Sequence, residues 1–248
     1  LTDSADELFE SVGLSCKGWS RSGEAPHPDV TDDGINLDVG GLRWQPQVDT
    51  LQVKIPPLHF GKKVRGKLKV GTEIFDGSFQ DLSSFVPEKL TRRQVVSKFS
   101  SVFDPYGKLC PVTSAMKHHC RMAVMETEGW DDPITLDTRK LWLKNFWQLH
   151  SLRGVMFMRA RIPEDAVSTD LTLICAVDAA NNMKAAGVWG RFARKNGKFS
   201  SQLLIGRSLL AKEGSSIPKE ELEAAAIGSN LLWICLLYTS PSPRDRSL

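Results

Sequence analysis

The spacing of apolar residues changes along the chain and predicts helices in some stretches and strands in others. Leu8 and Val12 lie four residues apart, as on one face of a short helix over residues 2–12. From residue 42 to residue 55, apolar and polar positions alternate, and Pro46 interrupts the alternation. This second pattern predicts a β-hairpin with its turn around Pro46.

The middle of the chain carries the signals of three helices. Thr91 and Gln94 have the spacing of a capping box, in which each side chain bonds the other residue's backbone N–H at a helix start. A tight turn is expected at residues 104–107, where proline comes second and glycine fourth. Pro111 can open a second helix. The apolar spacing over residues 136–149 predicts a third helix, whose tryptophan and phenylalanine belong to the core.

The spacing of apolar residues changes again after these helices. Apolar runs over residues 171–177, 186–193 and 198–205 predict three strands. The Asn-Gly pair at 196–197 predicts a type I′ turn, since both central positions of that turn take a positive φ. A Ser-Ile-Pro sequence then favours the start of a helix. The expected order is therefore strand, strand, strand, helix.

Charge is nearly balanced overall but clustered locally. The 248 residues include 32 lysines and arginines and 29 aspartates and glutamates, and a net charge of +3 does not indicate nucleic-acid binding. The first cationic group is Lys62, Lys63, Arg65, Lys67 and Lys69, and the second is Arg191, Arg194, Lys195 and Lys198. Either group could keep a hairpin soluble and its edge unpaired, or bind a phosphate backbone. Both interpretations stay open.

Cysteine usage and the start of the sequence favour a reduced, intracellular protein. The five cysteines are scattered and contain no Cys-x-x-Cys pair, unlike a disulfide framework. His118, His119 and Cys120 make a poor zinc site, because adjacent ligands cannot easily share one tetrahedral ion. The sequence starts at Leu1 and acidic residues follow at once, so we expect a fragment without a signal peptide. No apolar run approaches the roughly 20 residues of a membrane span.

Several short segments together carry a resemblance to a known family. They are residues 41–51 (Gly-Leu-Arg-Trp-Gln-Pro-Gln-Val-Asp-Thr-Leu), 103–113 (Phe-Asp-Pro-Tyr-Gly-Lys-Leu-Cys-Pro-Val-Thr), 130–133 (Trp-Asp-Asp-Pro), 177–180 (Val-Asp-Ala-Ala) and 217–224 (Ile-Pro-Lys-Glu-Glu-Leu-Glu-Ala). Each segment is short, but their order and spacing resemble the Pol polyprotein of Pao/BEL-type long-terminal-repeat retrotransposons. Part of this region is often labelled a Pao retrotransposon peptidase.

The resemblance implies an α+β fold in four parts. Residues 1–90 would be the end of a reverse transcriptase palm with hairpins, and residues 91–165 a small helical, thumb-like or connection unit. Residues 166–235 would be the first half of an RNase H-like domain, a truncated three-stranded antiparallel sheet with a helix. Residues 236–248 have the composition of a disordered, non-native tail.

By this resemblance the parent protein is an RNA-directed DNA polymerase whose RNase H cleaves the RNA of RNA–DNA hybrids with two Mg²⁺ ions. The matching carboxylates are Asp178, at the end of the first strand, and Glu221, in the first turns of the helix. Both would be catalytic residues and metal ligands. Without the resemblance, Asp178 is an ordinary strand-end acid and Glu221 an acid favoured by the helix dipole. The sequence departs from the family pattern by two extra acids, Glu220 and Glu223.

The chain lacks the Tyr-x-Asp-Asp turn of a polymerase, and the remaining RNase H acids are expected beyond Cys235. We therefore expect the fragment itself to catalyse neither reaction. The expected partners are an RNA–DNA hybrid or template–primer and the rest of the Pol polyprotein, not a membrane. The second cationic group would lie near the RNase H site. The resemblance further implies a cytoplasmic location in virus-like particles.

Two other functions compete with this interpretation. A non-catalytic nucleic-acid-binding remnant would use the two cationic groups without cleaving its ligand. An aspartic peptidase would need Asp-Thr-Gly or Asp-Ser-Gly between apolar strands, and neither tripeptide occurs. The sequence at Asp32-Asp33-Gly34 lacks the hydroxyl residue. The first alternative stays open, and the second is disfavoured.

Overall fold

The computed structural model describes residues 2–61, 63–64, 67–159, 162–163, 165–167 and 171–239. By their contacts the residues form two units, Leu1–Lys54 with Gly154–Ala160, and Ile55–Arg153 with Arg161–Leu248. Helices and antiparallel sheets occupy separate stretches of the chain, which confirms the α+β class. The two units differ from the division expected at residues 90 and 165. The assignment of the parts to palm, thumb and RNase H stays a prediction.

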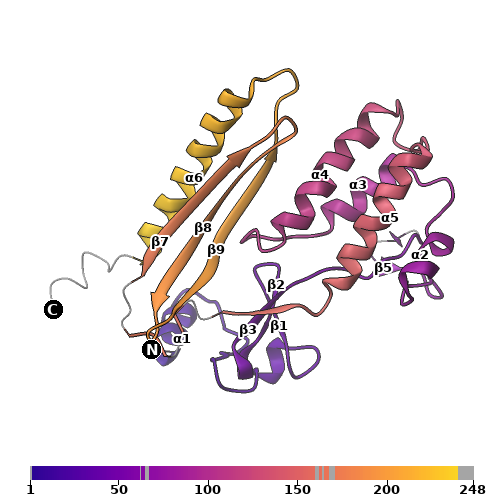
Figure 1. Cartoon of the computed structure of the whole chain (residues 1–248). Coiled ribbons are helices and arrows are strands. Elements are labelled where there is room, and N and C mark those ends of the chain that lie inside the picture. Colours follow the sequence, from indigo (N-terminus) through magenta and orange to yellow (C-terminus); the bar gives the residue numbers. More distant parts are fainter. Residues whose placement is uncertain are drawn as a thin grey trace. The chain divides into compact units, whose positions relative to one another are not determined.

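The smaller unit contains a helix and a four-stranded antiparallel sheet (Figure 1). Its elements are α1 (Thr2–Ser11), β1 (Leu37–Val39), β2 (Leu42–Gln45), β3 (Thr50–Val53) and β6 (Met156–Met158), with the strands in the order β1-β2-β3-β6. The expected first helix and the hairpin around Pro46 are confirmed. Strands β1 and β6 were not predicted. Strand β6 lies far from β3 in the sequence but pairs with it, so that Met158 is opposite Thr50.

The turn between β2 and β3 is stabilised by Asp49. Pro46 opens a short 3₁₀ helix, and Asp49 follows it with a positive φ of 51°. The Asp49 carboxylate accepts hydrogen bonds from Trp44 Nε1 at 3.0 Å and from Arg159 Nε at 2.6 Å. The Arg159 hydrogen bond contributes most to lowering the pKa of Asp49. The tryptophan and aspartate of the 41–51 segment therefore have a structural role in this turn.

The larger unit begins with a helical part. Its elements are a hairpin of β4 (Lys63–Val64) and β5 (Lys67–Leu68), then α2 (Phe79–Phe85), α3 (Arg92–Ser100), α4 (Cys110–Met125) and α5 (Leu136–Ser151). The three expected helices are confirmed as α3, α4 and α5, whereas α2 was not predicted. Trp142, Phe146 and Met116 are at most 1% exposed and lie in the core of this part.

Two sets of hydrogen bonds fix the start of α3. The Thr91 hydroxyl accepts the Gln94 backbone N–H, and Thr91 N donates to Gln94 Oε1 at 2.9 Å, which confirms the capping box. The backbone N–H of Arg93 donates to the carbonyl of Trp130 at 2.8 Å. The guanidinium of Arg92 lies 4.6 Å from the centre of the Trp130 ring. The Trp-Asp-Asp-Pro segment thus holds α3 in place.

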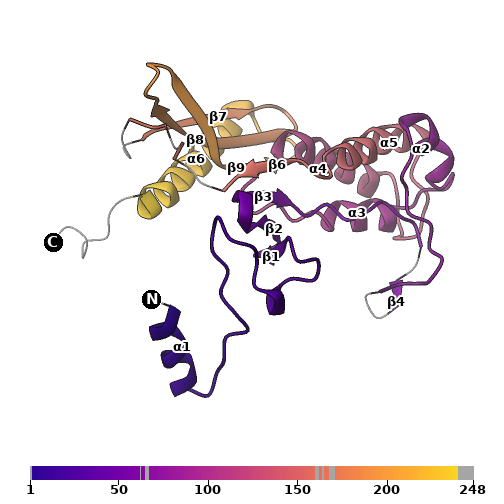
Figure 2. The ribbon, with the colours of Figure 1, turned by 90° about the horizontal axis from the view of Figure 1, so that it is seen from below.

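The rest of the larger unit is a three-stranded antiparallel sheet with one helix against it. Strands β7 (Thr172–Ala179), β8 (Met183–Ala193) and β9 (Phe199–Leu210) pair in that order, and α6 (Ile217–Thr239) follows. Figures 1 and 2 show α6 along one face of this sheet. The buried side chains between them are Ala186, Val188, Leu204, Leu231 and Cys235. The predicted order of three strands and a helix is confirmed.

The connection between β8 and β9 differs from the predicted type I′ turn. Gly197 has a positive φ of 75°, but Asn196 does not. A hydrogen bond of 2.8 Å from Arg194 N to the Lys198 carbonyl closes a three-residue loop, in which Gly197 takes the left-handed position. The prediction was wrong because Arg194, and not Lys195, pairs with Lys198, so that Lys195 joins Asn196 and Gly197 in the loop.

Helix α6 is longer than predicted. It extends to Thr239, because Leu231 and Cys235, one turn apart, keep the same buried face against the sheet. The disordered tail expected from residue 236 therefore does not begin there, and residues 240–248 lie outside the described part of the chain. None of the helices in that described part is both long and apolar enough to cross a membrane.

The helical part and the sheet meet where α4 contacts β9. The predicted turn at 104–107 is confirmed, and the Asp104 carboxylate accepts two of the backbone N–H groups that follow it, at 3.0 and 2.6 Å. Gly107 has a positive φ of 66° and lies so close to β9 that a Cβ there would overlap the carbonyl of Gly206. Lys117 of α4 donates to the carbonyl of Ser208 at 2.6 Å. The 103–113 segment therefore joins the two parts.

Candidate active site at one end of the sheet

Asp178 lies at the end of the three-stranded sheet where α6 begins. It is the penultimate residue of β7 and pairs with Ala185 near the start of β8. The first turn of α6 lies at the same end, because Lys184 of β8 binds Glu220 of α6. Figure 1 shows the carboxyl end of β7 and the amino end of α6 at this end of the sheet. The end of β7 and the start of α6 therefore lie at the same end of the sheet.

A lysine and two glutamates form an ion cluster beneath the first turn of α6. Lys184, which is 6% exposed, donates to Glu220 Oε2 at 2.5 Å and also to Glu223 Oε2. Glu220 is 1% exposed, and its Oε1 accepts the Lys212 backbone N–H at 3.1 Å. A buried charge needs such partners because burying it alone is costly. The cluster thus fixes the start of α6 on β8.

The cluster keeps Lys184 and Glu220 charged over a wide pH range. The hydrogen bond from Lys184 is the main cause that lowers the pKa of Glu220 to about 2. The hydrogen bonds to Glu220, and then to Glu223, raise the pKa of Lys184 above its ordinary value. Lys184 and Glu220 therefore each stabilise the ionised form of the other.

Asp178 and Glu221 have different surroundings from those of the cluster. Both are exposed, and no salt bridge between described residues engages either carboxylate. Neighbouring residues of a strand point to opposite faces. Ala179 pairs with Lys184, which faces α6, so the side chain of Ala179 is on that face of the sheet. The side chain of its neighbour Asp178 therefore points from the opposite face. The convergence of Asp178 and Glu221 on one metal stays a prediction.

The sequence profile of the Pao retrotransposon-like RNaseH-like domain matches residues 91–239, more than half of the chain. The chain belongs to this family. The match begins at the capping box of α3 and ends with α6, so it includes helices α3, α4 and α5 and the sheet of the larger unit. It confirms the resemblance to the Pao/BEL Pol region. No curated protein matches the chain.

RNase H-like domains generally use divalent metal ions. Asp178 and Glu221 provide the oxygen ligands that Mg²⁺ prefers. Their number is too small, however. Within the described residues, no group of three or more His, Cys, Asp and Glu side chains could hold a metal ion. The assignment of Asp178 and Glu221 as metal ligands therefore stays a prediction, and no catalytic step follows from them alone.

The second cationic group lies at the opposite end of the sheet from Asp178. The register places Arg191 opposite Thr172, at the start of β7, six residues from Asp178. At about 3.4 Å per residue, the two ends are roughly 20 Å apart. The prediction that these cations lie near the RNase H site was wrong. In an antiparallel sheet, the chain that turns at Asp178 must make its next turn at the far end.

Two of the four cations of this hairpin have side-chain partners. The Arg194 guanidinium binds Asp165, with Nε 2.8 Å from Oδ2. The Arg191 guanidinium lies 3.6 Å from the centre of the Phe199 ring. The two exposed cations are Lys195 and Lys198. The Pao domain thus presents these two lysines to solvent at the tip of the hairpin.

The structure describes less of the first cationic group. Lys69 is exposed. Lys63 and Lys67 lie on the paired strands β4 and β5, but their side chains lie outside the described part. Lys62 and Arg65 lie outside the described residues altogether. The role of this group in nucleic-acid binding stays a prediction.

Lys184 is the important residue that the sequence analysis missed. A signal for it existed, since Glu220 and Glu223 lie three residues apart and therefore on one face of the helix. Two acids on the inner face of a helix require a cation, and Lys184 is the charged residue in an apolar stretch of β8. The two acids that depart from the family pattern therefore serve the fold.

Proposed function

We propose that this chain is the RNase H-like part of a retrotransposon Pol polyprotein and that its complete parent cleaves the RNA strand of RNA–DNA hybrids. The proposal rests on the exposed Asp178 at the sheet end where α6 begins. That end offers one carboxylate from a strand and another, Glu221, from a helix. The family match supports nucleic acid as the general class of substrate. The polymerase activity of the parent is part of the same proposal.

Lys184 determines which acids are available at the start of α6. It holds Glu220 and Glu223 in ion pairs, whereas Glu221 is exposed between them. We infer that Asp178 and Glu221 are the share of the Mg²⁺ ligands that this chain contributes. In the complete enzyme the bound metal would activate water and stabilise the leaving oxygen. The residues of this chain would position the metal through two carboxylates.

The chain itself is proposed not to cleave RNA. Mg²⁺ bound by one or two carboxylates needs further oxygen ligands to be held in a defined position. Purified chain should therefore leave an RNA–DNA hybrid intact in the presence of Mg²⁺. Cleavage that Asp178→Asn abolishes would contradict this part of the proposal.

Metal binding provides the direct test. Mn²⁺ takes the place of Mg²⁺ as a paramagnetic probe, and NMR signals of backbone amides near the bound ion should broaden first. We expect the earliest broadening around Asp178 and Glu221, and weaker broadening in Asp178→Asn and in Glu221→Gln. Glu213→Gln, which changes an exposed acid in the loop before α6, is the matched control. If the broadening is the same in Asp178→Asn as in the unmodified chain, the assignment of the ligands is wrong.

A non-catalytic nucleic-acid-binding remnant is the second candidate. The exposed Lys195 and Lys198, far from Asp178, favour it, because a binding surface needs no metal. Under this alternative, hybrid affinity depends on the two lysines and Mn²⁺ finds no site at Asp178. The NMR titration therefore separates the two candidates.

A further inference from the structure

The outer face of α6, turned away from the sheet, carries exposed apolar side chains. Leu222, Trp233 and Leu236 are 71%, 62% and 45% exposed. The inner face of the same helix packs on the sheet through Leu231 and Cys235, and Figures 1 and 2 show the sheet along that side of α6. Large apolar side chains that are exposed together mark a surface that binds another molecule. The outer face of α6 is therefore a candidate interface.

The exposed positions of this face follow the spacing of a seam between two helices. Intervals of three and four residues alternate along it, as in helices that pack along their length. We call these exposed positions the α6 seam: Lys219, Leu222, Ala226, Ser229, Trp233 and Leu236. No charged residue occurs from residue 224 to residue 239. A helix without a charged face is normally covered on all sides, so the seam predicts a helical partner.

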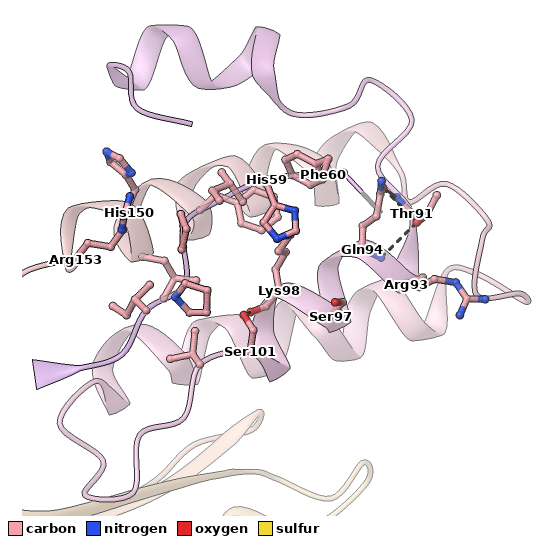
Figure 3. A pocket seen from close by; sticks show the side chains of 18 of the residues that line it. His59, Phe60, Thr91, Arg93, Gln94, Ser97, Lys98, Ser101, His150 and Arg153 are labelled. Carbon is pink, nitrogen blue, oxygen red and sulfur yellow. Dashed lines mark hydrogen bonds between the residues drawn. The ribbon is translucent and has the colours of Figure 1, made fainter. Parts of the chain in front are cut away.

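The hollow in the helical part of the larger unit is a different kind of surface (Figure 3). It has a volume of about 580 Å³ and lies between the segment 55–61, α3 and α5. Its aromatic residue Phe60 already packs against Phe85 and Phe146, with ring centres 5.9 and 5.7 Å apart. The apolar surface of the hollow thus belongs to the core of the helical part, whereas the large side chains of the α6 seam are exposed.

The middle of the α6 seam can be buried without leaving a polar side chain unpaired. Ala226 has no polar side-chain atom, and the Ser229 hydroxyl already donates to the carbonyl of Ala225 at 3.0 Å. A hydroxyl that keeps its hydrogen bond can be buried at little cost. Both side chains are small, so that two helix axes could approach to about 8 Å at this point.

The order of side chains along the seam is the same from its middle toward either end. A small residue comes first and a large one second. Ala226 and then Leu222 follow in one direction, and Ser229 and then Trp233 in the other. A second copy turned by a half rotation would therefore set its Trp233 against Leu222 and its Ser229 against Ala226. Such a self-complementary surface is what a two-fold symmetric dimer requires.

We propose that the α6 seam binds the same seam of a second copy of this chain, with the two helices antiparallel. A parallel pair would bring the two Lys219 ammonium groups together, whereas in an antiparallel pair Lys219 lies beside Leu236 of the other copy. Antiparallel helices also place unlike ends of their dipoles side by side. The inference goes beyond the proposed function and does not need the metal site, because Asp178 points from the opposite face of the sheet.

Analytical ultracentrifugation of the full chain tests the proposal. Two single helices make a small interface, and small interfaces typically give weak, reversible complexes. We therefore expect a monomer–dimer equilibrium in the micromolar range, without larger species. A chain that stays monomeric throughout this range, or that forms aggregates of undefined size, contradicts the inference.

Single substitutions in the seam locate the interface. Ala226→Glu brings two like charges into its middle and should weaken the dimer on the order of a hundredfold. Trp233→Ala removes the largest side chain of the seam and should weaken the dimer by roughly tenfold or more. Ala193→Glu, which introduces the same charge at an exposed position of β8, is the matched control and should leave the dimer unchanged. Circular dichroism and thermal melting confirm that each variant is folded.

A compensating variant tests the antiparallel arrangement. In Ala226→Glu/Ser229→Lys, the introduced glutamate of one copy faces the introduced lysine of the other, so that much of the affinity should return. In a parallel pair like charges would face each other, and the affinity would not return. If the double variant dimerises no better than Ala226→Glu, the antiparallel seam is wrong. If Ala226→Glu and Trp233→Ala both leave the dimer Kd unchanged, or if Ala193→Glu weakens the dimer as much as they do, the α6 seam is not the interface.

Discussion

The two ends of the β7–β9 sheet carry charge in opposite ways. At the α6 end, Lys184 and Glu220 are almost completely buried and bind each other at 2.5 Å. At the hairpin end, Lys195 and Lys198 are exposed, and the Arg194–Asp165 pair is itself about 40% exposed on both sides. The ends are separated by the length of β7. The buried charges at the α6 end therefore serve the fold, whereas the lysines at the hairpin end are available to ligands.

The difference in burial predicts different consequences of mutation. A buried ion pair contributes little compared with an apolar pair of the same size, but removal of one partner leaves a buried charge without compensation. An exposed ion pair is screened by water and salt, so that its loss is scarcely measurable. The same type of substitution should therefore have a large effect at the α6 end and a small one at the hairpin end.

Lys184→Met should give the largest loss of stability. It leaves Glu220 charged and buried, and we expect Tm to fall by roughly 10 °C for a chain of this size. Thermal unfolding followed by circular dichroism measures the shift. Lys195→Met at the hairpin end is the matched control and should leave Tm nearly unchanged. In the double variant Lys184→Met/Glu220→Leu, much of the loss should be recovered; equal losses in the single and double variants would contradict the role of the cluster.

The pH dependence of stability should reveal the same cluster. The pKa of Glu220 is lowered to about 2 in the folded chain, whereas glutamate in an unfolded chain has a pKa of about 4.3. A lowered pKa contributes stability that is present above about pH 4 and is lost as the pH falls toward 2. Tm measured from pH 6 to pH 2 should fall more steeply for the unmodified chain than for Lys184→Met/Glu220→Leu. Parallel curves would show that Glu220 is not the responsible group.

Local sequence signals predicted most helices and strands of the fold. The capping box at Thr91 and the apolar period of α5 depend on neighbours in sequence, and both predictions were confirmed. The pairing of β6 with β3 joins Met158 to Thr50, and no local pattern encodes so distant a contact. Helix α2, only seven residues long, offers too few positions for a clear period.

The candidate site was predicted in outline but not in its electrostatics. The order of three strands and a helix was sufficient to place Asp178 beside the start of α6. The pairing of Lys184 with Glu220 depends on the sheet register, which the sequence pattern did not specify. The position of the second cationic group was derivable, since consecutive antiparallel strands turn at alternate ends. Asp178 lies at the connection of β7 to β8, and Lys195 and Lys198 lie at the next connection, of β8 to β9. The two lysines are therefore at the opposite end of the sheet from Asp178.

The hairpin lysines should affect ligand binding instead of stability. If Lys195 and Lys198 each neutralise one phosphate of an RNA–DNA hybrid, Lys195→Ala/Lys198→Ala should reduce the salt slope of hybrid binding by about 1.8. Kd measured at several salt concentrations gives this slope. The comparison pair is Lys212→Ala/Lys219→Ala, which removes two exposed lysines near the α6 end. If the salt slope is unchanged in the hairpin variant, the two lysines do not bind the hybrid and serve solubility alone.

The smallest effects should come from the backbone, and here the two ends should behave alike. Gly197 in the hairpin and Gly214 in the loop before α6 have positive φ values of 75° and 73°, and both have open space where a Cβ would lie. A substitution at either position therefore meets strain from the backbone angle and not from a neighbouring atom. Gly197→Ala and Gly214→Ala should each destabilise the fold by about 1 kcal/mol. Gly197→Asn should cost less, because asparagine tolerates the left-handed region better than alanine. Chemical denaturation of the three variants gives the free energies of unfolding. A much larger loss in Gly214→Ala than in Gly197→Ala would mean that the loop before α6 also positions Glu220, through the Lys212 N–H that its carboxylate accepts.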